Sequence, residues 1–293
     1  MGALDGIRHW PVDHVAAALV TAEGAVESAG AVHHRFALAS ITKLLTATAV
    51  LVAVEEEVLG LDDPEGPVGA TVRHLLAHAS GIAPDGDAVI APPGTRRAYS
   101  NRGYELLGEL VTARSGIPFA DYLTEAVLAP LHMTSTTLDG SPAAGARGTI
   151  DDLVRFARDW SAPQPIVLAA ETRDRAIEPA FPDIGGVLPG FGRHDPNPWG
   201  LGPEIRGAKR PHWTGATCSP RTYGHFGRAG TLLWIDPDAS VGLVVLTDRE
   251  FGPWAAEAWP ALGDAVLADH ATPGDHAEPA HDAPGPGRAG AGG

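Results

Sequence analysis

The sequence predicts an α/β (α+β) fold: an antiparallel sheet built from both chain ends and flanked by helices, with an inserted, mainly helical region. The first observation is that Val- and Ala-rich runs broken by turn residues lie near both ends of the chain, at 14–32 and 231–248. The second is that helix-like patterns fill much of the segment between 40 and 160. Along the chain, strands are followed by helices and then by strands again. This order results when a helical region is inserted into a sheet.

The first elements are a hairpin and a buried helix. Residues 14–32 break at a Glu-Gly pair, which favours a β-hairpin. Residues 40–60 are apolar almost all round and end in glycine, a pattern typical of a buried helix, and Ser40 stands at the start. Further helices are predicted at 71–79, 101–116, 118–131 and 149–160.

The second half of the chain begins with loops and returns to strands. Proline and glycine recur between 161 and 211, so we expect a loop-rich region there. Two β-rich runs at 231–248 are joined by an Asp-Pro-Asp turn. We expect a final helix at 253–269 to pack on the sheet, although Pro260 argues against it.

These elements predict a division of the chain into regions. We expect 1–60 and 205–270 to form one sheet region, and 61–204 to form an inserted helical, loop-rich region. Residues 271–293 lack large apolar side chains, so we expect a disordered tail. With 293 residues, of which 44% are hydrophobic, the chain can bury a sizeable core.

Composition narrows the class of protein. A formal net charge of -15 argues against a nucleic-acid partner, because such binding depends on basic residues that neutralise phosphates. No run approaches the roughly 18 apolar residues that cross a bilayer, so no membrane partner is expected. The start of the chain does not have a signal-peptide pattern, which predicts a cytoplasmic location. The single cysteine, Cys218, excludes an internal disulfide. The sequence gives no prediction of the oligomeric state.

Several formal motifs lack the context that their chemistry needs. The tail contains Gly285-Pro-Gly287-Arg-Ala-Gly290, but a dinucleotide site requires a preceding strand and a following helix. His74 and His78 are four apart, but Leu75 stands where a zinc protease needs glutamate, so packing or hydrogen-bonded histidines are favoured. Neither GxSxG nor a P-loop is present. We therefore expect no metal and no cofactor.

Lys43 is the first residue that points to chemistry. It and Lys209 are the two lysines of a chain with 21 lysines and arginines. An amine can lose its proton when it is desolvated, whereas a guanidinium in practice cannot. Ser40 lies three residues earlier, so the two side chains share one face of the predicted helix. A neutral amine there can accept the serine proton, and the helix start favours an oxyanion.

Two further segments supply possible partners. Tyr99 and Asn101 lie just before a predicted helix. A nearby ammonium can lower the pKa of a phenol enough for the phenol to carry a proton, and an asparagine amide can orient the lysine. His225-Phe226-Gly227 begins the returning strands, and a Gly-rich edge strand lets a substrate backbone lie close. Taken alone, a Tyr-x-Asn segment is mostly found in turns, and the second segment is also compatible with a glycine-rich turn.

Together these elements resemble the serine β-lactamase and penicillin-binding-protein superfamily, in its class C β-lactamase-like branch, which includes D-Ala-D-Ala carboxypeptidases, D-amino-acid amidases and esterases. Ser40-Ile-Thr-Lys43 matches the SxxK motif, Tyr99-Ser-Asn101 the YxN motif and His225-Phe226-Gly227 the third motif. The surrounding segments are also similar, from about Val15 to about Ala268. The resemblance implies a β-lactamase/transpeptidase-like fold.

The resemblance also implies roles for these residues. Ser40 would be the acylated nucleophile, Lys43 the amine that assists its deprotonation, and Tyr99 the general base in acylation and the acid toward the leaving group. Asn101 would hold Lys43 and the substrate acyl amide. His225 and Gly227 would line the strand beside the substrate, and the backbone N–H groups of Ser40 and Arg228 would form the oxyanion hole.

The third motif departs from the usual pattern, in which a lysine and a hydroxyl residue engage a substrate carboxylate. His225 is weakly charged at neutral pH and Phe226 has no hydroxyl, so carboxylate recognition is weakened unless Arg228 or another arginine compensates. We therefore expect a serine hydrolase that acts through an acyl-enzyme on a small ester, amide or peptide. The alternatives are β-lactamase or D-Ala-D-Ala carboxypeptidase activity, acyl transfer to a small molecule, and a catalytically weak ligand-binding module.

Overall fold

A computed structural model describes residues 2–270. The predicted disordered tail at 271–293, with its formal Gly-x-Gly-x-x-Gly pattern, lies outside the described residues. The predicted division into regions at 60, 205 and 270 stays a prediction.

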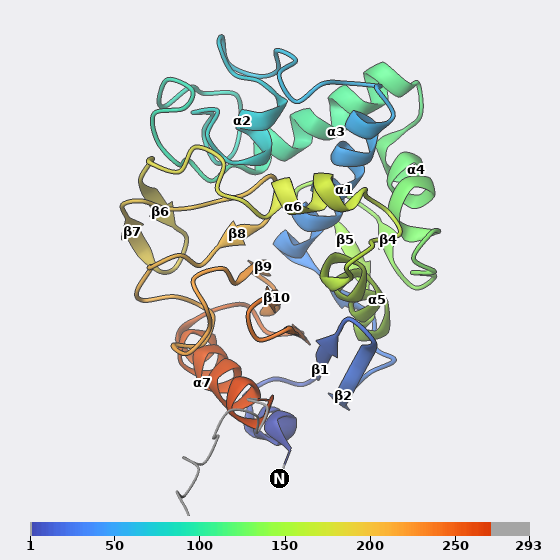
Figure 1. The fold of residues 1–293 in the computed structure, drawn as a ribbon, viewed down its shortest axis with the longest axis vertical. Coiled ribbons are helices and arrows are strands. Elements are labelled where there is room, and N and C mark those ends of the chain that lie inside the picture. Colours follow the sequence, from blue (N-terminus) through green and yellow to red (C-terminus); the bar gives the residue numbers. More distant parts are fainter. Residues whose placement is uncertain (1, 271–293) are drawn as a thin grey trace, which may run out of the picture.

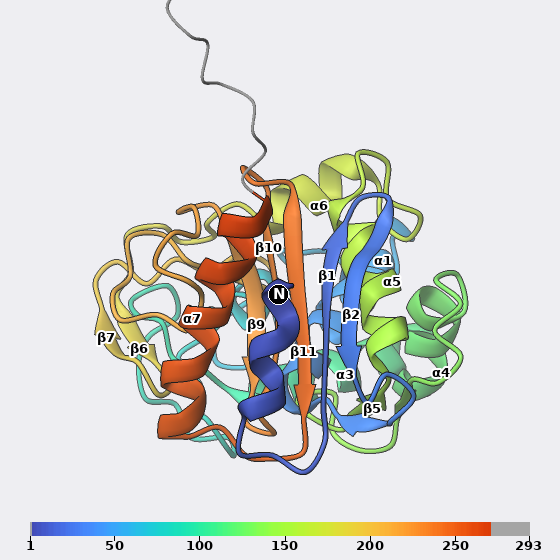
Figure 2. The ribbon, with the colours of Figure 1, turned by 90° about the horizontal axis from the view of Figure 1, so that it is seen from below.

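A six-stranded antiparallel sheet lies at the centre of the fold (Figures 1 and 2). In spatial order its strands are β2 (Gly24–Gly30), β1 (Val15–Thr21), β11 (Val241–Thr247), β10 (Thr231–Asp236), β9 (Tyr223–Gly227) and β8 (Glu204–Ile205). β1 pairs with β11, from Val15 opposite Thr247 to Val20 opposite Gly242. Strands from the two ends of the chain are thus neighbours, and the predicted fold class is confirmed.

Helices cover both faces of this sheet. Helix α7 (Pro253–His270) and a short 3-10 helix at Ala3–His9 pack on one face, as Figure 2 shows, and α5 (Ile150–Ser161) packs on the other. Successive side chains of β1 alternate between two separate apolar cores, because neighbouring residues of a strand point to opposite faces. The sheet is therefore buried on both sides.

Five further helices of the described chain lie above the sheet in Figure 1. They are α1 (Thr42–Glu55), α2 (Val72–Leu76), α3 (Asn101–Ser115), α4 (Phe119–Leu123) with a π-helical turn at Thr124–Leu128, and α6 (Ala170–Ala176). Short strands complete the fold: β3 (Phe36–Ala37), β4 (Thr137–Leu138) and β5 (Ala146–Gly148) in one small sheet, and the hairpin of β6 (Gly186–Leu188) and β7 (Gly192–His194).

Several predicted bounds differ from those of the structure. The predicted helix at 40–60 starts as a 3-10 turn at Ala39–Ile41, and its α-helical part ends at Glu55. The predicted helix at 71–79 is only α2, because the chain turns at His78, whose φ is 53°. Helix α6 lies inside the predicted loop region. Helix α7 continues through Pro260, because its buried Trp259 and Val266 hold it against the sheet.

Candidate active site

Ser40 lies on the tight turn between β3 and α1. Ala39, directly before it, has a φ of 46°, a left-handed conformation that is strained for a residue with a side chain. The turn is pressed against β9 and β10: Thr231 Oγ1, at the start of β10, donates a 2.9 Å hydrogen bond to the carbonyl oxygen of Leu38. A Cβ on Gly227 would lie 2.7 Å from that same oxygen. Gly227 is thus needed for the close approach of β9 to the Ser40 turn.

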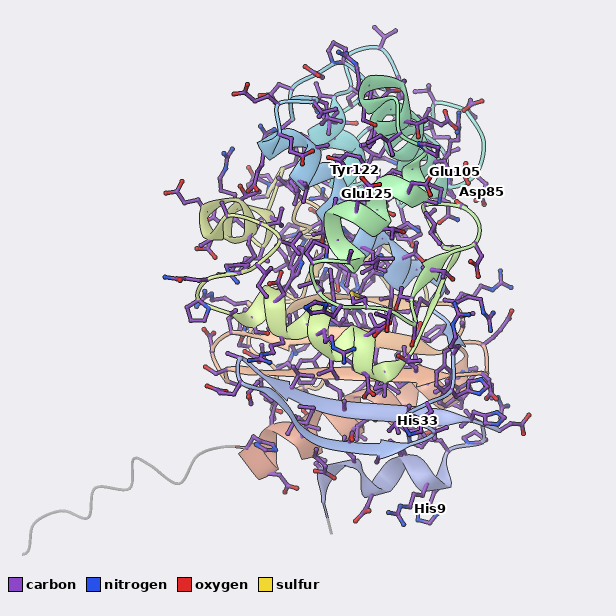
Figure 3. All side chains as sticks on the ribbon, turned by 90° about the vertical axis from the view of Figure 1, so that its right-hand side faces the viewer. His9, His33, Asp85, Glu105, Tyr122 and Glu125 are labelled. Atoms are coloured by element: carbon purple, nitrogen blue, oxygen red, sulfur yellow. The ribbon has the colours of Figure 1, made fainter. Side chains whose placement is uncertain are left out.

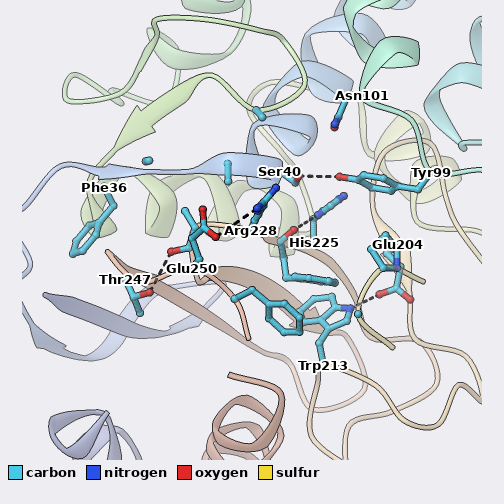
Figure 4. A pocket seen from close by; sticks show the side chains of 18 of the residues that line it. Phe36, Ser40, Tyr99, Asn101, Glu204, Trp213, His225, Arg228, Thr247 and Glu250 are labelled. Atoms are coloured by element: carbon cyan, nitrogen blue, oxygen red, sulfur yellow. Dashed lines mark hydrogen bonds and ion pairs between the residues drawn. The ribbon is translucent and has the colours of Figure 1, made fainter. Parts of the chain in front are cut away.

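The structure brings Ser40, Lys43, Tyr99 and Asn101 into one hydrogen-bonded cluster. The Tyr99 phenol donates to Ser40 Oγ at 2.8 Å, a contact drawn in Figure 4. Lys43 Nζ lies 3.5 Å from Ser40 Oγ and donates to Asn101 Oδ1 at 2.7 Å and to the carbonyl oxygen of Ala143 at 2.9 Å. The predicted convergence of Ser40, Lys43 and Tyr99 is therefore present, with Asn101 holding the lysine.

Burial changes the protonation of the lysine. Lys43 is fully buried, and desolvation lowers the pKa of its amine to about 7, although Asp85 and Glu105 act in the opposite direction. Both carboxylates lie in the helical part of the molecule, where Figure 3 labels them. Because the pKa is near neutrality, a large share of Lys43 is the free amine at pH 7, and a free amine can accept a proton from Ser40.

The tyrosine behaves differently from the expectation. Desolvation at the cavity wall raises the pKa of Tyr99 above its ordinary value, and the hydrogen bond to Ser40 only partly opposes this. The predicted lowering of this pKa is therefore wrong, because burial of the phenol outweighs the hydrogen bond to Ser40, and the charge of Asp85 also raises the pKa. Tyr99 is a neutral phenol at pH 7, suited to relay a proton or to give one to a leaving group.

His225 is buried on β9 and does not act as a cation. Its Nδ1 donates to the carbonyl oxygen of Phe226 at 2.6 Å, since a carbonyl oxygen can only accept. Burial, followed by the charge of Lys43, lowers the pKa of His225 to about 3. β8 pairs only with Tyr223 and Gly224, so β9 from His225 onward has an open outer edge within the described residues.

Arg228 follows β9 at the mouth of the site. Its side chain is 83% exposed and lies 3.6 Å from the carboxylate of Glu250 (Figure 4). An exposed pair of this kind contributes little to stability. The guanidinium is thus accessible to a ligand, and the role of the Arg228 N–H in an oxyanion hole stays a prediction.

A cavity of about 800 Å³ opens beside Ser40. Aromatic side chains form much of its wall, and charged side chains lie at other points of its lining. The aromatic residues are Phe36, Tyr99, Trp199, Trp213, Phe226 and Phe251. The charged ones include Arg35, Arg147, Arg228, Asp248 and Glu250. Such a cavity suits an apolar group held next to the nucleophile.

The second lysine belongs to a buried network that the sequence analysis missed. Lys209 donates to the carboxylate of Glu204, which also lines the cavity, and both side chains are almost fully buried. Trp213 Nε1 donates to Glu204 at 2.7 Å, and His212 Nε2 donates at 3.0 Å. Lys209 lies in the Pro- and Gly-rich segment that ends at 211, and His212 and Trp213 follow directly after it. No motif or periodic pattern in this part of the sequence indicates such a network.

His78 supports Tyr99 and the residue that follows it. Its Nδ1 accepts a hydrogen bond from the backbone N–H of Ser100 at 3.1 Å, and its ring packs against Tyr99 at a centroid distance of 4.5 Å. The prediction of a packing or hydrogen-bonded histidine is confirmed at this position. Within residues 2–270, no group of three or more histidine, cysteine or acidic side chains is placed to hold a metal ion.

The fold and the cluster together define a class of protein. An antiparallel sheet flanked by helices, with an SxxK serine and lysine beside a tyrosine, has the architecture of the serine β-lactamase and penicillin-binding-protein superfamily. A model of the Beta-lactamase family matches residues 14–268, and the chain belongs to this family. This match confirms the predicted membership. The family is made up of serine hydrolases.

Solved structures and relatives place the chain more closely. A β-lactamase from Mycobacterium bovis superposes with a TM-score of 0.90 at 51% identity, covering 92% of this chain and 99% of the other. EstCE1, a hydrolase with promiscuous acyltransferase activity, shares the fold with a TM-score of 0.74 at 17% identity, covering 90% of this chain and 96% of the other. Penicillin-binding protein 4* of Bacillus subtilis is 31% identical over 134 residues, 34% of this chain, and the match spans 30% of its length.

Within the described residues, no helix has the length and apolar character required to cross a bilayer.

Proposed function

We propose that the chain is a serine hydrolase that forms an acyl-enzyme at Ser40 and acts on small ester or amide substrates. The observation that carries this proposal is the placement of Ser40 Oγ, 2.8 Å from the Tyr99 phenol and 3.5 Å from an amine with a pKa of about 7. Such an arrangement activates a hydroxyl that is otherwise a weak nucleophile.

In the proposed mechanism, Ser40 Oγ forms a bond to the acyl carbon while Lys43 takes up the hydroxyl proton, directly or through Tyr99. When the acyl bond to the leaving alcohol or amine breaks, its electron pair stays with the leaving group, and Tyr99 gives that group a proton which Lys43 replaces. A water molecule then attacks the acyl-enzyme by the same steps in reverse. The backbone N–H groups of Ser40 and Arg228 stabilise the oxyanion.

The cavity supports a preference for apolar acyl groups. Its aromatic wall favours an apolar group, and His225 with a pKa of about 3 provides no charge for a carboxylate. Asn101 Oδ1 is occupied by Lys43, and its Nδ2 donates to Asp85 at 3.0 Å, so a substrate amide would have to replace the second of these bonds. Esters are therefore the preferred substrates in this proposal.

A chromogenic butyrate ester and a fluorophosphonate test the proposal. We expect ester turnover and a covalent adduct at Ser40, measured by intact mass, and neither in Ser40→Ala. Ser28→Ala, at an exposed position on β2, is the matched control and should behave as wild type. Equal behaviour of wild type and Ser40→Ala toward several acyl donors would rule the mechanism out. Products formed with and without added alcohols distinguish hydrolysis from acyl transfer.

β-Lactamase activity is a second candidate function. It is favoured by the 51% identity to a protein described as a β-lactamase. The neutral His225 in the third motif weighs against efficient turnover. Nitrocefin hydrolysis, compared with butyrate ester hydrolysis by the same preparation, measures which activity is dominant. The predicted cytoplasmic location stays a prediction that cell fractionation can check.

A further inference from the structure

A second cavity of about 360 Å³ lies next to the first. Tyr99 and Pro189 line both, so the two cavities are adjacent at the tyrosine whose phenol touches Ser40. The walls of the second cavity come from the segment just before Tyr99 and from the β6–β7 hairpin. Neither segment has been given a role in the chemistry above.

The wall of this second cavity is held in place by the chain itself. Arg97 and Gly186 form a bridge between the two segments, and a Cβ on Gly186 would lie 2.2 Å from the carbonyl oxygen of Arg97. The Arg97 guanidinium donates to four backbone carbonyl groups, so it acts as a brace and is not free for a ligand. Figure 1 shows the hairpin beside the loops between α2 and α3. The cavity is thus a built feature of the fold.

Two kinds of side chain line the opening. Ile90 and Val187 are 43% and 55% exposed, and apolar side chains at this exposure gain from contact with an apolar group. Arg96 and Arg193 are exposed, and no hydrogen bond or ion pair of either guanidinium is present within residues 2–270. Arg193 lies opposite Val187 in the hairpin. No aspartate or glutamate is among the described residues that line this cavity.

From this we propose that the second cavity is a subsite for the leaving group of the acyl donor, an apolar alcohol that ends in a carboxylate. The proposal rests on the proposed function, because Tyr99 is there the donor of the proton to the leaving oxygen. A leaving group that receives this proton must lie at Tyr99, which lines both cavities. The apolar body would then contact Ile90 and Val187, and the carboxylate would pair with Arg96 and Arg193.

The chemical step is ordinary transesterification followed by hydrolysis. Ser40 Oγ bonds to the acyl carbon, the bond between that carbon and the leaving oxygen breaks, and the oxygen keeps the electron pair and takes a proton from Tyr99. Water then cleaves the acyl-enzyme and releases the acid. The subsite changes only how tightly the leaving alcohol is held while the bond breaks.

Two butyrate esters that differ in one charge test the subsite. One carries 3-(4-hydroxyphenyl)propanoate as the leaving group, and the other carries the uncharged carboxamide of the same phenol. We expect kcat/KM to be about fivefold to tenfold higher for the carboxylate, which is the size expected of one or two exposed ion pairs. In the double variant Arg96→Gln/Arg193→Gln this preference should vanish, so that the ratio of kcat/KM for the two esters falls to about one.

The matched control removes the same charge elsewhere. Arg114→Gln/Arg221→Gln changes two exposed arginines that do not line either cavity, and it should keep the preference. A preference that persists in the Arg96/Arg193 variant, or that is lost equally in the control, would overturn the subsite.

A binding measurement separates this proposal from the proposed function. In Ser40→Ala protein, the free phenol carboxylate should bind several-fold more tightly than its carboxamide, and only if Arg96 and Arg193 are present. If Ser40 of the wild-type protein is not acylated but this binding preference is present, the proposed hydrolase is contradicted. The carboxylate-binding role of the second cavity is then still supported. Acylation of Ser40 without any preference for the carboxylate would contradict the subsite alone.

Discussion

The phenol of Tyr99 donates a 2.8 Å hydrogen bond to Ser40 Oγ although the two residues are 59 positions apart in the chain. Tyr99 precedes α3 and Ser40 precedes α1, and the packing of these two helices brings the starts of both together. The amine of Lys43 completes the arrangement from the first turn of α1. Four predictions follow from the chemistry of this cluster and of the buried network beside it.

The first concerns pH. If the free amine of Lys43 is the base, its pKa of about 7 sets the profile, because protonation at lower pH removes the base. The rate of Ser40 acylation by a fluorophosphonate should therefore rise with pH through about 7 and level off near pH 8 or above. A rate that is constant from about pH 5.5 to 8.5, or that falls with pH, is incompatible with this role.

The second tests the lysine itself. Lys43→Arg keeps a cation but removes a group that can lose its proton, so kcat/KM for the butyrate ester should fall by about 10²-fold to 10⁴-fold. Since the larger guanidinium could disturb the buried site, Lys43→Met serves as a second variant of similar length without charge. Both variants should show a loss of this size, and a cooperative thermal unfolding transition should show that each is folded. Full activity of a well-folded Lys43→Arg would refute the assignment.

The third tests the tyrosine. Tyr99→Phe removes the hydroxyl that contacts Ser40 while the ring keeps its packing against His78 and Trp199. We expect the melting temperature to change little and kcat/KM to fall by about 10²-fold or more. The loss should be larger for esters with poorly acidic alcohols, because these need the proton most. An equal loss for all leaving groups would assign Tyr99 to positioning only.

The fourth concerns the buried ion pair. Glu204→Gln removes the buried carboxylate that accepts hydrogen bonds from Lys209, His212 and Trp213, so the free energy of unfolding should fall by about 3–5 kcal/mol. Asp238→Asn, which breaks the exposed pair with Arg221, should change it by less than about 1 kcal/mol. Urea unfolding of both variants gives the comparison. Equal effects at the two sites would show that the network is not a stabilising element.

Much of the site could be predicted from the sequence, because its residues lie in short local patterns. Ser40 and Lys43 are one helical turn apart, and Tyr99 and Asn101 share one loop, so spacing alone placed each pair together. The Val-rich runs at the two chain ends likewise predicted the strands that pair in the central sheet. These features depend on interactions between residues that are near one another in sequence, or on a repeated apolar pattern.

The remaining features depend on packing between distant segments. The raised pKa of Tyr99, the lowered pKa of His225 and the Lys209–Glu204 pair all result from burial, which no local pattern reports. The second cavity exists because the β6–β7 hairpin closes on the segment before Tyr99. The sequence by itself therefore determined that strands from both chain ends flank a helical region, and it supplied the candidate site residues. The tertiary structure decided the protonation of these residues and the shape of the space around them, because desolvation and cavity walls arise only when distant segments pack.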